Sequence, residues 1–198
     1  MATLKVPLFP LSTVLFPQGV LPLRIFEPRY LSMVAECMRN ELEFGVVLIT
    51  AGSDAGEPAR FHQIGTLARI EDFDQLDDGY LGITCRGGRR FKVLEHALND
   101  DHLVEAGIEI LADTAADLSV LNEDFPSMIK FAHDLMKRDE LKEWLKSIDP
   151  QWDNPQWLSC RLSELLPLSL ESRQTLLEMP LTDRLTQLSN VLRENKLI

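Results

Sequence analysis

The side chains that most often bind metal ions or form covalent links are few in this sequence and lie far apart. The three cysteines, Cys37, Cys85 and Cys160, are odd in number and include no CxxC pair. Zinc sites and disulfide frameworks need cysteines or histidines at short, regular spacings. We therefore expect no metal ligands and no disulfide, and interpret the cysteines as reduced, partly buried residues. The four histidines are scattered, which is typical of surface or capping residues: His62, His96, His102 and His133.

No motif for phosphate, dinucleotide or nucleophilic chemistry is present. A Walker loop needs Gly-Lys before Ser or Thr, and the chain has no Gly-Lys dipeptide. It also lacks GxGxxG, GxSxG and HExxH motifs. Acidic pairs such as Asp77 with Asp78 stand in polar turns, where no apolar neighbour raises a carboxyl pKa. We therefore expect no catalytic residue, no cofactor and no enzymatic activity.

Two groups of side chains have both a binding and a structural interpretation. Basic residues surround Gly87-Gly88, and arginine forks suit phosphate or carboxylate groups: Arg86, Arg89, Arg90 and Lys92. We favour the alternative, a turn or bulge whose arginines pair with nearby acids. The three tryptophans between Trp144 and Trp157 fit a helical core better than an aromatic binding surface.

Charge and hydropathy limit the partners and the compartment. The formal net charge is −11 and the sequence pI is about 4.8, which argues against nucleic acid and anionic membranes as partners. No apolar run approaches the ~20 residues that a transmembrane helix needs. Residues 1–9 lack the basic and apolar regions of a signal peptide. We expect a soluble, cytoplasmic protein without membrane contact.

Short apolar runs separated by turn signals predict a β-rich domain over residues 1–115. The run 44–49 suits burial on both faces, and prolines in the first two runs predict edge strands or bends. Residues 51–58 read as a loop, and turns are expected at 77–79, 87–88 and 99–101. Strands at near-regular spacing favour a closed or nearly closed antiparallel sheet, with strands at 4–9, 20–26, 44–49, 64–73, 80–85, 90–95 and 103–111.

Helical spacing appears once within this region and then throughout residues 116–198. Pro28 stands where a first helical residue belongs, and apolar residues follow at helical spacing. From Leu118 the apolar period is helical, and Pro126 predicts either a kink or two helices. Asn154-Pro155 opens another helix, and leucines from 181 to 192 mark the last. The fold class is therefore α+β, with a small α-helical bundle after the β-rich domain.

One long motif adds a family resemblance. The stretch VPLFPLSTVLFPQGVLPLRIFEPRYLSMV, residues 6–34, resembles the opening of the Lon protease amino-terminal domain, the LON substrate-binding domain. The segments 44–49, 64–70 and 87–91 resemble the FGVVLI, VGTLARI and GxxRF segments of that family. The closing helices, from 162 onward, also fit. The resemblance covers nearly the whole chain.

The resemblance implies a PUA-like β-barrel with one inserted helix, followed by the helical bundle. It also implies recognition of unfolded or damaged polypeptides, with a protease or chaperone as a further partner. These 198 residues contain neither an ATPase motif nor a Ser–Lys protease module, so we expect a stand-alone, non-catalytic relative. The resemblance assigns substrate binding to matched residues: Phe16, Leu23, Arg24, Phe26, Glu27, Arg29 and Arg90.

Several alternatives stay open. Arg24, Glu27 and Arg29 are also interpreted as an ion network that fixes the inserted helix, and Phe9, Leu23 and Phe26 as core residues. RNA or small-ligand binding through the PUA-like domain is the alternative function. The sequence leaves the oligomeric state and the identity of the client open.

Overall fold

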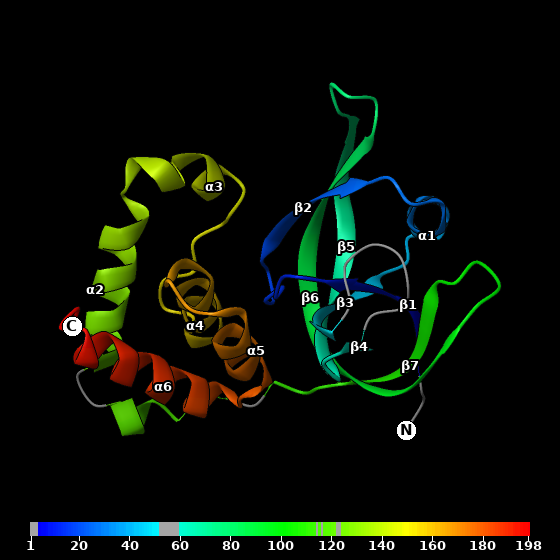
Figure 1. The fold of residues 1–198 in the computed structure, drawn as a ribbon. Coiled ribbons are helices and arrows are strands. Elements are labelled where there is room, and N and C mark those ends of the chain that lie inside the picture. Colours follow the sequence, from blue (N-terminus) through cyan, green and yellow to red (C-terminus); the bar gives the residue numbers. More distant parts are fainter. Residues whose placement is uncertain (1–3, 52–59, 114, 116, 122–123) are drawn as a thin grey trace. The chain divides into compact units, whose positions relative to one another are not determined.

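Strands and helices segregate along the chain in the computed structural model, which describes residues 4–51, 60–113, 115, 117–121 and 124–198 (Figure 1). The chain divides into two compact units, Met1–Ala112 and Asp113–Ile198. Among the described residues, the first unit holds seven strands and one helix, and the second is helical. The α+β class predicted from the sequence is confirmed.

The β unit contains one helix between its second and third strands. Its elements are β1 (Leu4–Leu11), β2 (Val20–Ile25), α1 (Pro28–Asn40), β3 (Phe44–Ala51), β4 (Arg60–Phe61), β5 (Ile64–Gln75), β6 (Leu81–Leu98) and β7 (Val104–Ile110). Pro28 is the first residue of α1, as predicted. The predicted loop at 51–58 lies outside the described residues except for Ala51, which ends β3.

The strand pairings form a ring. The sheet order is β1-β7-β6-β5-β3-β4, and an additional pairing of β1 with β3 joins the ends of the five-strand path. This last pair is parallel, with Leu8 opposite Gly45, whereas a fully antiparallel sheet was expected. A parallel pair needs a long crossover, and the chain between β1 and β3 provides it with β2 and α1.

The prolines of β1 are accommodated by a change of partner along the strand. Leu4–Leu8 pair with β7, and Leu8–Leu11 pair with β3. Pro7 therefore pairs only with β7 and Pro10 only with β3, so each proline has one side on which no strand requires a backbone donor. β1 is not an edge strand as a whole, but each half has an edge.

Two apolar clusters hold the β unit together, and the strands alternate between them. Leu8 and Val47 belong to a cluster built from strand residues alone. Phe9 and Val46 belong to a second cluster that also contains Met33 and Val34 of α1. The predicted burial of residues 44–49 on both faces is confirmed over Phe44–Leu48.

The predicted turn at Gly87-Gly88 is wrong, because β6 continues through it as an 18-residue strand. A Cβ at Gly87 would lie 2.2 Å from the carbonyl oxygen of Phe16. In β5, Thr66 pairs with Arg90 of β6 and Ala68 pairs with Gly87. Two steps along β5 therefore correspond to three along β6, so β6 has an extra residue there. The glycines allow close backbone approach at a β-bulge, which was the structural alternative for this segment.

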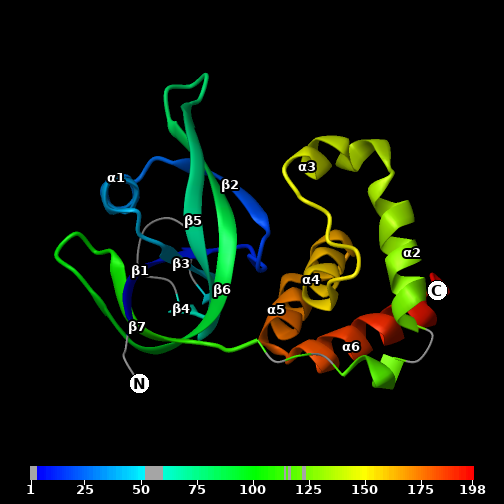
Figure 2. The same ribbon diagram turned by 180° about the vertical axis from the view of Figure 1, so that it is seen from behind.

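The second unit is a bundle whose main helices are α2 (Asp124–Met136), α4 (Pro155–Leu165), α5 (Leu170–Glu178) and α6 (Leu181–Glu194). α6 contacts α2, α4 and α5, as the rear view shows (Figure 2). Shorter helical turns are η1 (Leu118–Leu121), η2 (Asp139–Leu141) and α3 (Lys142–Lys146). No helix in the described part of the chain is long and apolar enough to cross a membrane.

The caps of these helices follow the sequence signals. The Asn154 side chain accepts hydrogen bonds from Gln156 N and Trp157 N, at 3.0 and 3.2 Å. Pro126 lies in the first turn of α2, where its missing N–H has no helical acceptor, so it causes no kink. Trp157 is buried and packs edge to face on Trp152, which favours the core interpretation of the tryptophans.

Gly87→Ala should destabilise the β unit by roughly 1–3 kcal/mol, because the new methyl group meets backbone that cannot move independently. Gly88→Ala is the matched control: its nearest atom is the flexible Glu43 carboxylate, at 2.9 Å. Urea unfolding followed by far-UV circular dichroism measures both. Equal losses for the two variants would contradict the close-approach explanation.

Glu164 gives the helical unit a pH dependence. Burial raises the pKa of Glu164 to about 7, although Arg161 and Arg173 favour its charged form. The unfolded chain ionises this group near 4.5, so its contribution to stability is complete below that pH and is lost as the pH rises to 7.

Glu164→Gln should therefore gain stability relative to the natural protein between pH 4.5 and 7, by at most about 3 kcal/mol. Urea unfolding followed by tryptophan fluorescence reports on this unit, because all three tryptophans lie within 144–157. A constant difference between the two proteins from pH 5 to pH 8 would refute the raised pKa.

Candidate functional site

Part of the sheet extends beyond the ring as a three-stranded arm, which consists of residues 20–25 of β2, 70–75 of β5, the turn 76–80 and residues 81–86 of β6. β6 lies in the centre, with Leu23 and Phe73 both opposite Ile83. The β5–β6 hairpin projects past β2 and α1 in Figure 1. The arm is the part of the β unit that the ring does not enclose.

The turn of the arm has the geometry that its sequence predicts. Leu76 N donates to Tyr80 O at 2.9 Å, and Gly79 N donates to Leu76 O at 2.8 Å. Gly79 has a φ of +84°, which an L-residue rarely adopts. The Asp78 carboxylate accepts from Tyr80 N at 3.2 Å and thereby closes the turn. The predicted turn at 77–79 is confirmed.

Arg24 and Phe26 gather around Tyr80 at the base of this turn. The Arg24 guanidinium lies 4.3 Å from the centre of the Tyr80 ring and 2.8 Å from the Asp78 carboxylate. Phe26 meets the same ring edge to face, with 6.3 Å between ring centres. Phe26 is 52% exposed, so its interpretation as a core residue is wrong. The group joins the end of β2 to the hairpin.

Large apolar side chains stay exposed on the arm. Phe73 is 58% exposed, and Leu76 and Tyr80 are also exposed. A hollow of about 310 Å³ lies beside Phe73 and Leu76, with Pro22 and Arg24 on its lining. Its floor includes Gly82, where a Cβ would come within 2.8 Å of the Leu76 side chain. The arm thus offers a recess with apolar walls that is open to solvent.

Two carboxylates, Asp72 and Asp74, also line this recess. Residues 71–80, EDFDQLDDGY, contain five acids and no Lys or Arg. The cations around this stretch are engaged: Arg86 Nε donates to Glu71 at 2.8 Å, and Arg24 pairs with Asp78. The predicted pairing of the Gly87–Gly88 arginines with local acids is confirmed for Arg86, and Arg89 lies 3.9 Å from Glu43. The arm is apolar and acidic at once.

The remaining predicted site residues lie away from the arm surface or within its structure. Phe16 is fully buried, and Leu23 is half-buried against the cluster that contains α1. Arg90 is buried in β6, and its carbonyl accepts from Leu111 N at 2.9 Å. Phe16 and Arg90 therefore support the scaffold, whereas Leu23 also lines the recess beside Phe73.

Glu27 and Arg29 form the other part of the predicted ion network. Their side chains meet at 2.9 Å, and Arg29 donates to the His102 carbonyl at 3.1 Å. Arg29 is therefore tied to the turn between β6 and β7, whereas Arg24 is tied to the arm. The predicted pairing is therefore confirmed for Glu27 with Arg29 and is wrong for Arg24, which pairs with Asp78.

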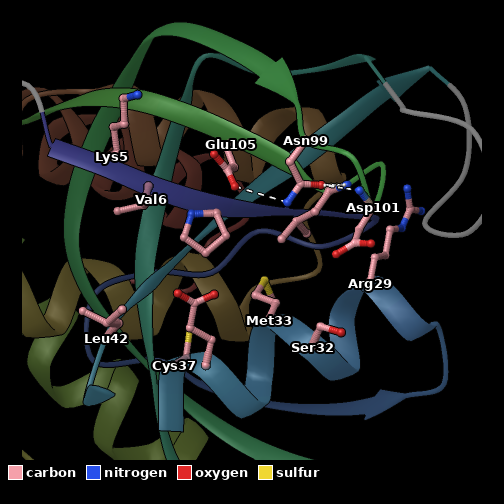
Figure 3. A pocket seen from close by; sticks show the side chains of 13 residues that line it. Lys5, Val6, Arg29, Ser32, Met33, Cys37, Leu42, Asn99, Asp101 and Glu105 are labelled. Carbon is pink, nitrogen blue, oxygen red and sulfur yellow. Dashed lines mark hydrogen bonds between the residues drawn. The ribbon is translucent and has the colours of Figure 1, made fainter. Parts of the chain in front are cut away.

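A second hollow lies between α1, β1 and the β6–β7 turn, with a volume of about 250 Å³ (Figure 3). Arg29 and Asp101 lie at one end of it, and Leu42 lies at the other. On the β6–β7 side of the hollow, Asn99 Nδ2 donates to Glu105 at 3.2 Å. The lining mixes two cations with three carboxylates, so it favours no single charge of ligand.

The thiols near these hollows are poor nucleophiles. Burial raises the pKa of Cys37 to about 11, with Glu36 adding to the rise, and burial raises that of Cys85 to about 12. Thiolate is the reactive form, so both groups are unreactive at neutral pH. No cluster of three potential metal ligands occurs among the described residues.

The comparisons with known proteins agree with this architecture. The family model for the ATP-dependent protease La (LON) substrate-binding domain matches residues 5–194. The chain belongs to the LON substrate-binding domain family. Lon protease 1 of Bdellovibrio bacteriovorus is 26% identical over 202 residues, which cover 96% of this chain and 25% of that protein. Lon protease 1 of Hydrogenovibrio crunogenus is 28% identical over 184 residues, 88% of this chain and 22% of that protein.

Solved structures show the same fold. A Lon N-terminal domain protein from Xanthomonas campestris is 35% identical and covers 93% of this chain and 96% of its own, with a TM-score of 0.70. The N-terminal domain of the Mycobacterium avium complex Lon protease has the same TM-score at 18% identity, with coverage of 94% and 97%. The present chain spans about a quarter of the length of the curated Lon proteases it matches.

Phe73, Leu76 and Tyr80, which form most of the exposed apolar surface of the arm, were not predicted as site residues from the sequence. A local signal exists, because these residues are interleaved with acids around the turn at 77–79. Such a pattern also fits a half-buried hairpin. Only the strand pairing shows that this hairpin extends beyond the ring.

The two predicted arginines should differ in their effect on stability. Arg29→Ala should cost about 2 kcal/mol, because it leaves the half-buried Glu27 carboxylate and the His102 carbonyl without a donor. Arg24→Ala should cost no more than about 1 kcal/mol, because its ion pair is exposed to solvent. Urea unfolding of both variants tests this, and a larger loss for Arg24→Ala would contradict the assignment.

Proposed function

We propose that this chain recognises exposed apolar segments of unfolded or damaged polypeptides through the arm. The observation that carries the proposal is the exposure of Phe26, Phe73, Leu76 and Tyr80 on the arm, where Phe73 and Leu76 line an open recess. Monomeric proteins rarely expose large apolar patches without a binding role. Membership of a substrate-binding family supports the same role.

A non-catalytic role is part of the proposal. The buried thiols have raised pKa values, and the carboxylates of the arm stand in exposed turns. A binding module of this kind would pass its client to a protease or chaperone. The Lon proteases that the chain resembles combine such a domain with other modules, since it spans about a quarter of their length.

Charge and geometry favour polypeptide over the alternative ligands. The arm is acidic and the whole chain carries −11, and both repel phosphate backbones. Small-molecule binding rests on the hollow in Figure 3, whose mixed charges and open shape suit no single ligand class. Apolar side chains on the arm suit the apolar residues that unfolding exposes.

Fluorescence anisotropy with labelled lysozyme, reduced and alkylated with iodoacetamide, tests this function. The unfolded probe should bind saturably in the micromolar range. Native lysozyme carries nearly the same charge, so it shows how much binding charge alone provides. Phe73→Ser should weaken binding of the unfolded probe roughly tenfold, because one large apolar side chain no longer packs against the client.

Leu94→Ser is the matched control, since Leu94 is an exposed apolar residue of β6 outside the arm. It should change the dissociation constant less than twofold. Equal binding of native and unfolded lysozyme, or equal effects of the two variants, would contradict apolar recognition by the arm. Binding of a labelled twenty-nucleotide RNA in place of lysozyme would favour the nucleic-acid alternative.

A further inference from the structure

The arm has two edge strands, β2 and the outer part of β5, and neither has a further neighbouring strand in the described part of the chain. β2 contains Pro22, which lacks a backbone donor, so the outer part of β5 offers the more complete edge. β5 pairs with β3 from Thr66 to Ala68, and from Ile70 to Gln75 its only partner is β6. An edge of this kind exposes backbone donors and acceptors in a row. It is a template on which an extended peptide can add as a further strand.

The hydrogen bonds of the turn show which groups face this edge. Leu76 N bonds to Tyr80 O across the hairpin, so alternation turns Asp74 toward β6 and Phe73 and Gln75 away from it. Phe73 N donates to the Asp72 carboxylate at 2.9 Å, and Gln75 N donates to the Asp74 carboxylate at 2.7 Å. The backbone N–H groups of Phe73 and Gln75, which face away from β6, are therefore bonded to the exposed carboxylates of the residues that precede them. An incoming strand can replace these local bonds.

The two sides of the free edge differ in chemistry. On one side lies the recess of about 310 Å³, with Asp72 and Asp74 on its lining. On the other lies a hollow of about 460 Å³ between β5 and the end of α1, whose apolar lining residues include Phe73, Met38 and Leu42. Its charged lining residues are Arg69, Glu71 and Glu41. Side chains of a strand alternate between the two sides. A strand added here would place every second residue beside Asp72 and Asp74 and the others beside Phe73, Met38 and Leu42.

We propose that the edge Ile70–Gln75 binds an extended polypeptide segment in which apolar residues alternate with Lys or Arg. The inference rests on the proposed function and specifies its client and its mode of binding. Asp72 and Asp74 on the lining of the recess complement the basic side chains, and Arg24, the cation on that lining, is paired with Asp78. The aliphatic stems of those side chains can lie along Pro22 and Leu76 while their charged groups reach the carboxylates.

Labelled ten-residue peptides test the sequence preference. One alternates Val or Phe with Lys, a second has Glu in place of Lys, and a third has the same composition as the first with its lysines in one block. The alternating Lys peptide should bind at least tenfold more tightly than either of the others in fluorescence anisotropy. Equal binding of the block peptide would overturn the strand register, and equal binding of the Glu peptide would overturn the role of the acids.

Backbone methylation tests strand addition without altering the protein. Two versions of the alternating peptide carry N-methyl groups on either set of alternate residues. The set whose N–H groups face β5 should lose binding at least tenfold, and the other set should change it less than threefold. Equal effects of the two sets would overturn the proposal.

A variant of the edge provides the complementary test. Gln75→Pro removes a donor that faces away from β6, so the β5–β6 ladder keeps its bonds. The variant should weaken binding of the alternating Lys peptide at least fivefold, while its thermal unfolding midpoint stays unchanged. Asp72→Asn with Asp74→Asn should remove most of the preference for Lys over Glu.

If these peptides fail to bind while unfolded lysozyme still binds through Phe73, the proposed function stands and this inference falls. If neither the peptides nor unfolded lysozyme bind, both proposals fall.

Discussion

The contact between Gly87 and the segment from Phe16 to Gly19 determines how the β unit is assembled. Gln18 N donates to Gly87 O at 2.7 Å, and Gly87 N donates to Gly19 O at 2.8 Å. A side chain at position 87 would collide with the Phe16 carbonyl, so the contact requires glycine. It directs β2 along β6 away from the ring, and α1 then packs on the adjacent face. The arm and the helix that bounds its hollows both follow from this approach.

The elements with local signals could be predicted from the sequence. Pro28 and the Asn154-Pro155 cap mark helix starts by their own backbone chemistry, and both helices begin where expected. Gly87-Gly88 was misread because glycine marks both a turn and a close approach, and only the distant Phe16 separates the two. The exposure of Phe73 was missed for a similar reason. It depends on β3 ending its pairing with β5 at Ala68, which no local pattern shows.

The family motif between residues 20 and 30 combines scaffold and surface within a few positions. Ile25 is buried in the cluster with α1, while its neighbours Arg24 and Phe26 are exposed at the arm. Arg29, at the start of α1, is again drawn inward to the His102 carbonyl. The five candidate residues between Leu23 and Arg29 thus lie in one short stretch of sequence but have two different roles. Those that contact solvent could bind a client, and those that face inward hold the arm and the helix in place.

An exposed strand edge exposes a protein to aggregation, and the arm carries a known kind of protection. Asp72 and Asp74 cover the outward donors of β5, and the register shift near Glu71 interrupts the edge. Charged side chains at a strand edge repel some partners and attract others, whereas an element that covers the edge excludes all of them. A second copy of this chain, with its net charge of −11, is repelled by the same carboxylates that attract a basic segment. Protection against self-association and preference for a basic client are therefore two consequences of one pair of side chains.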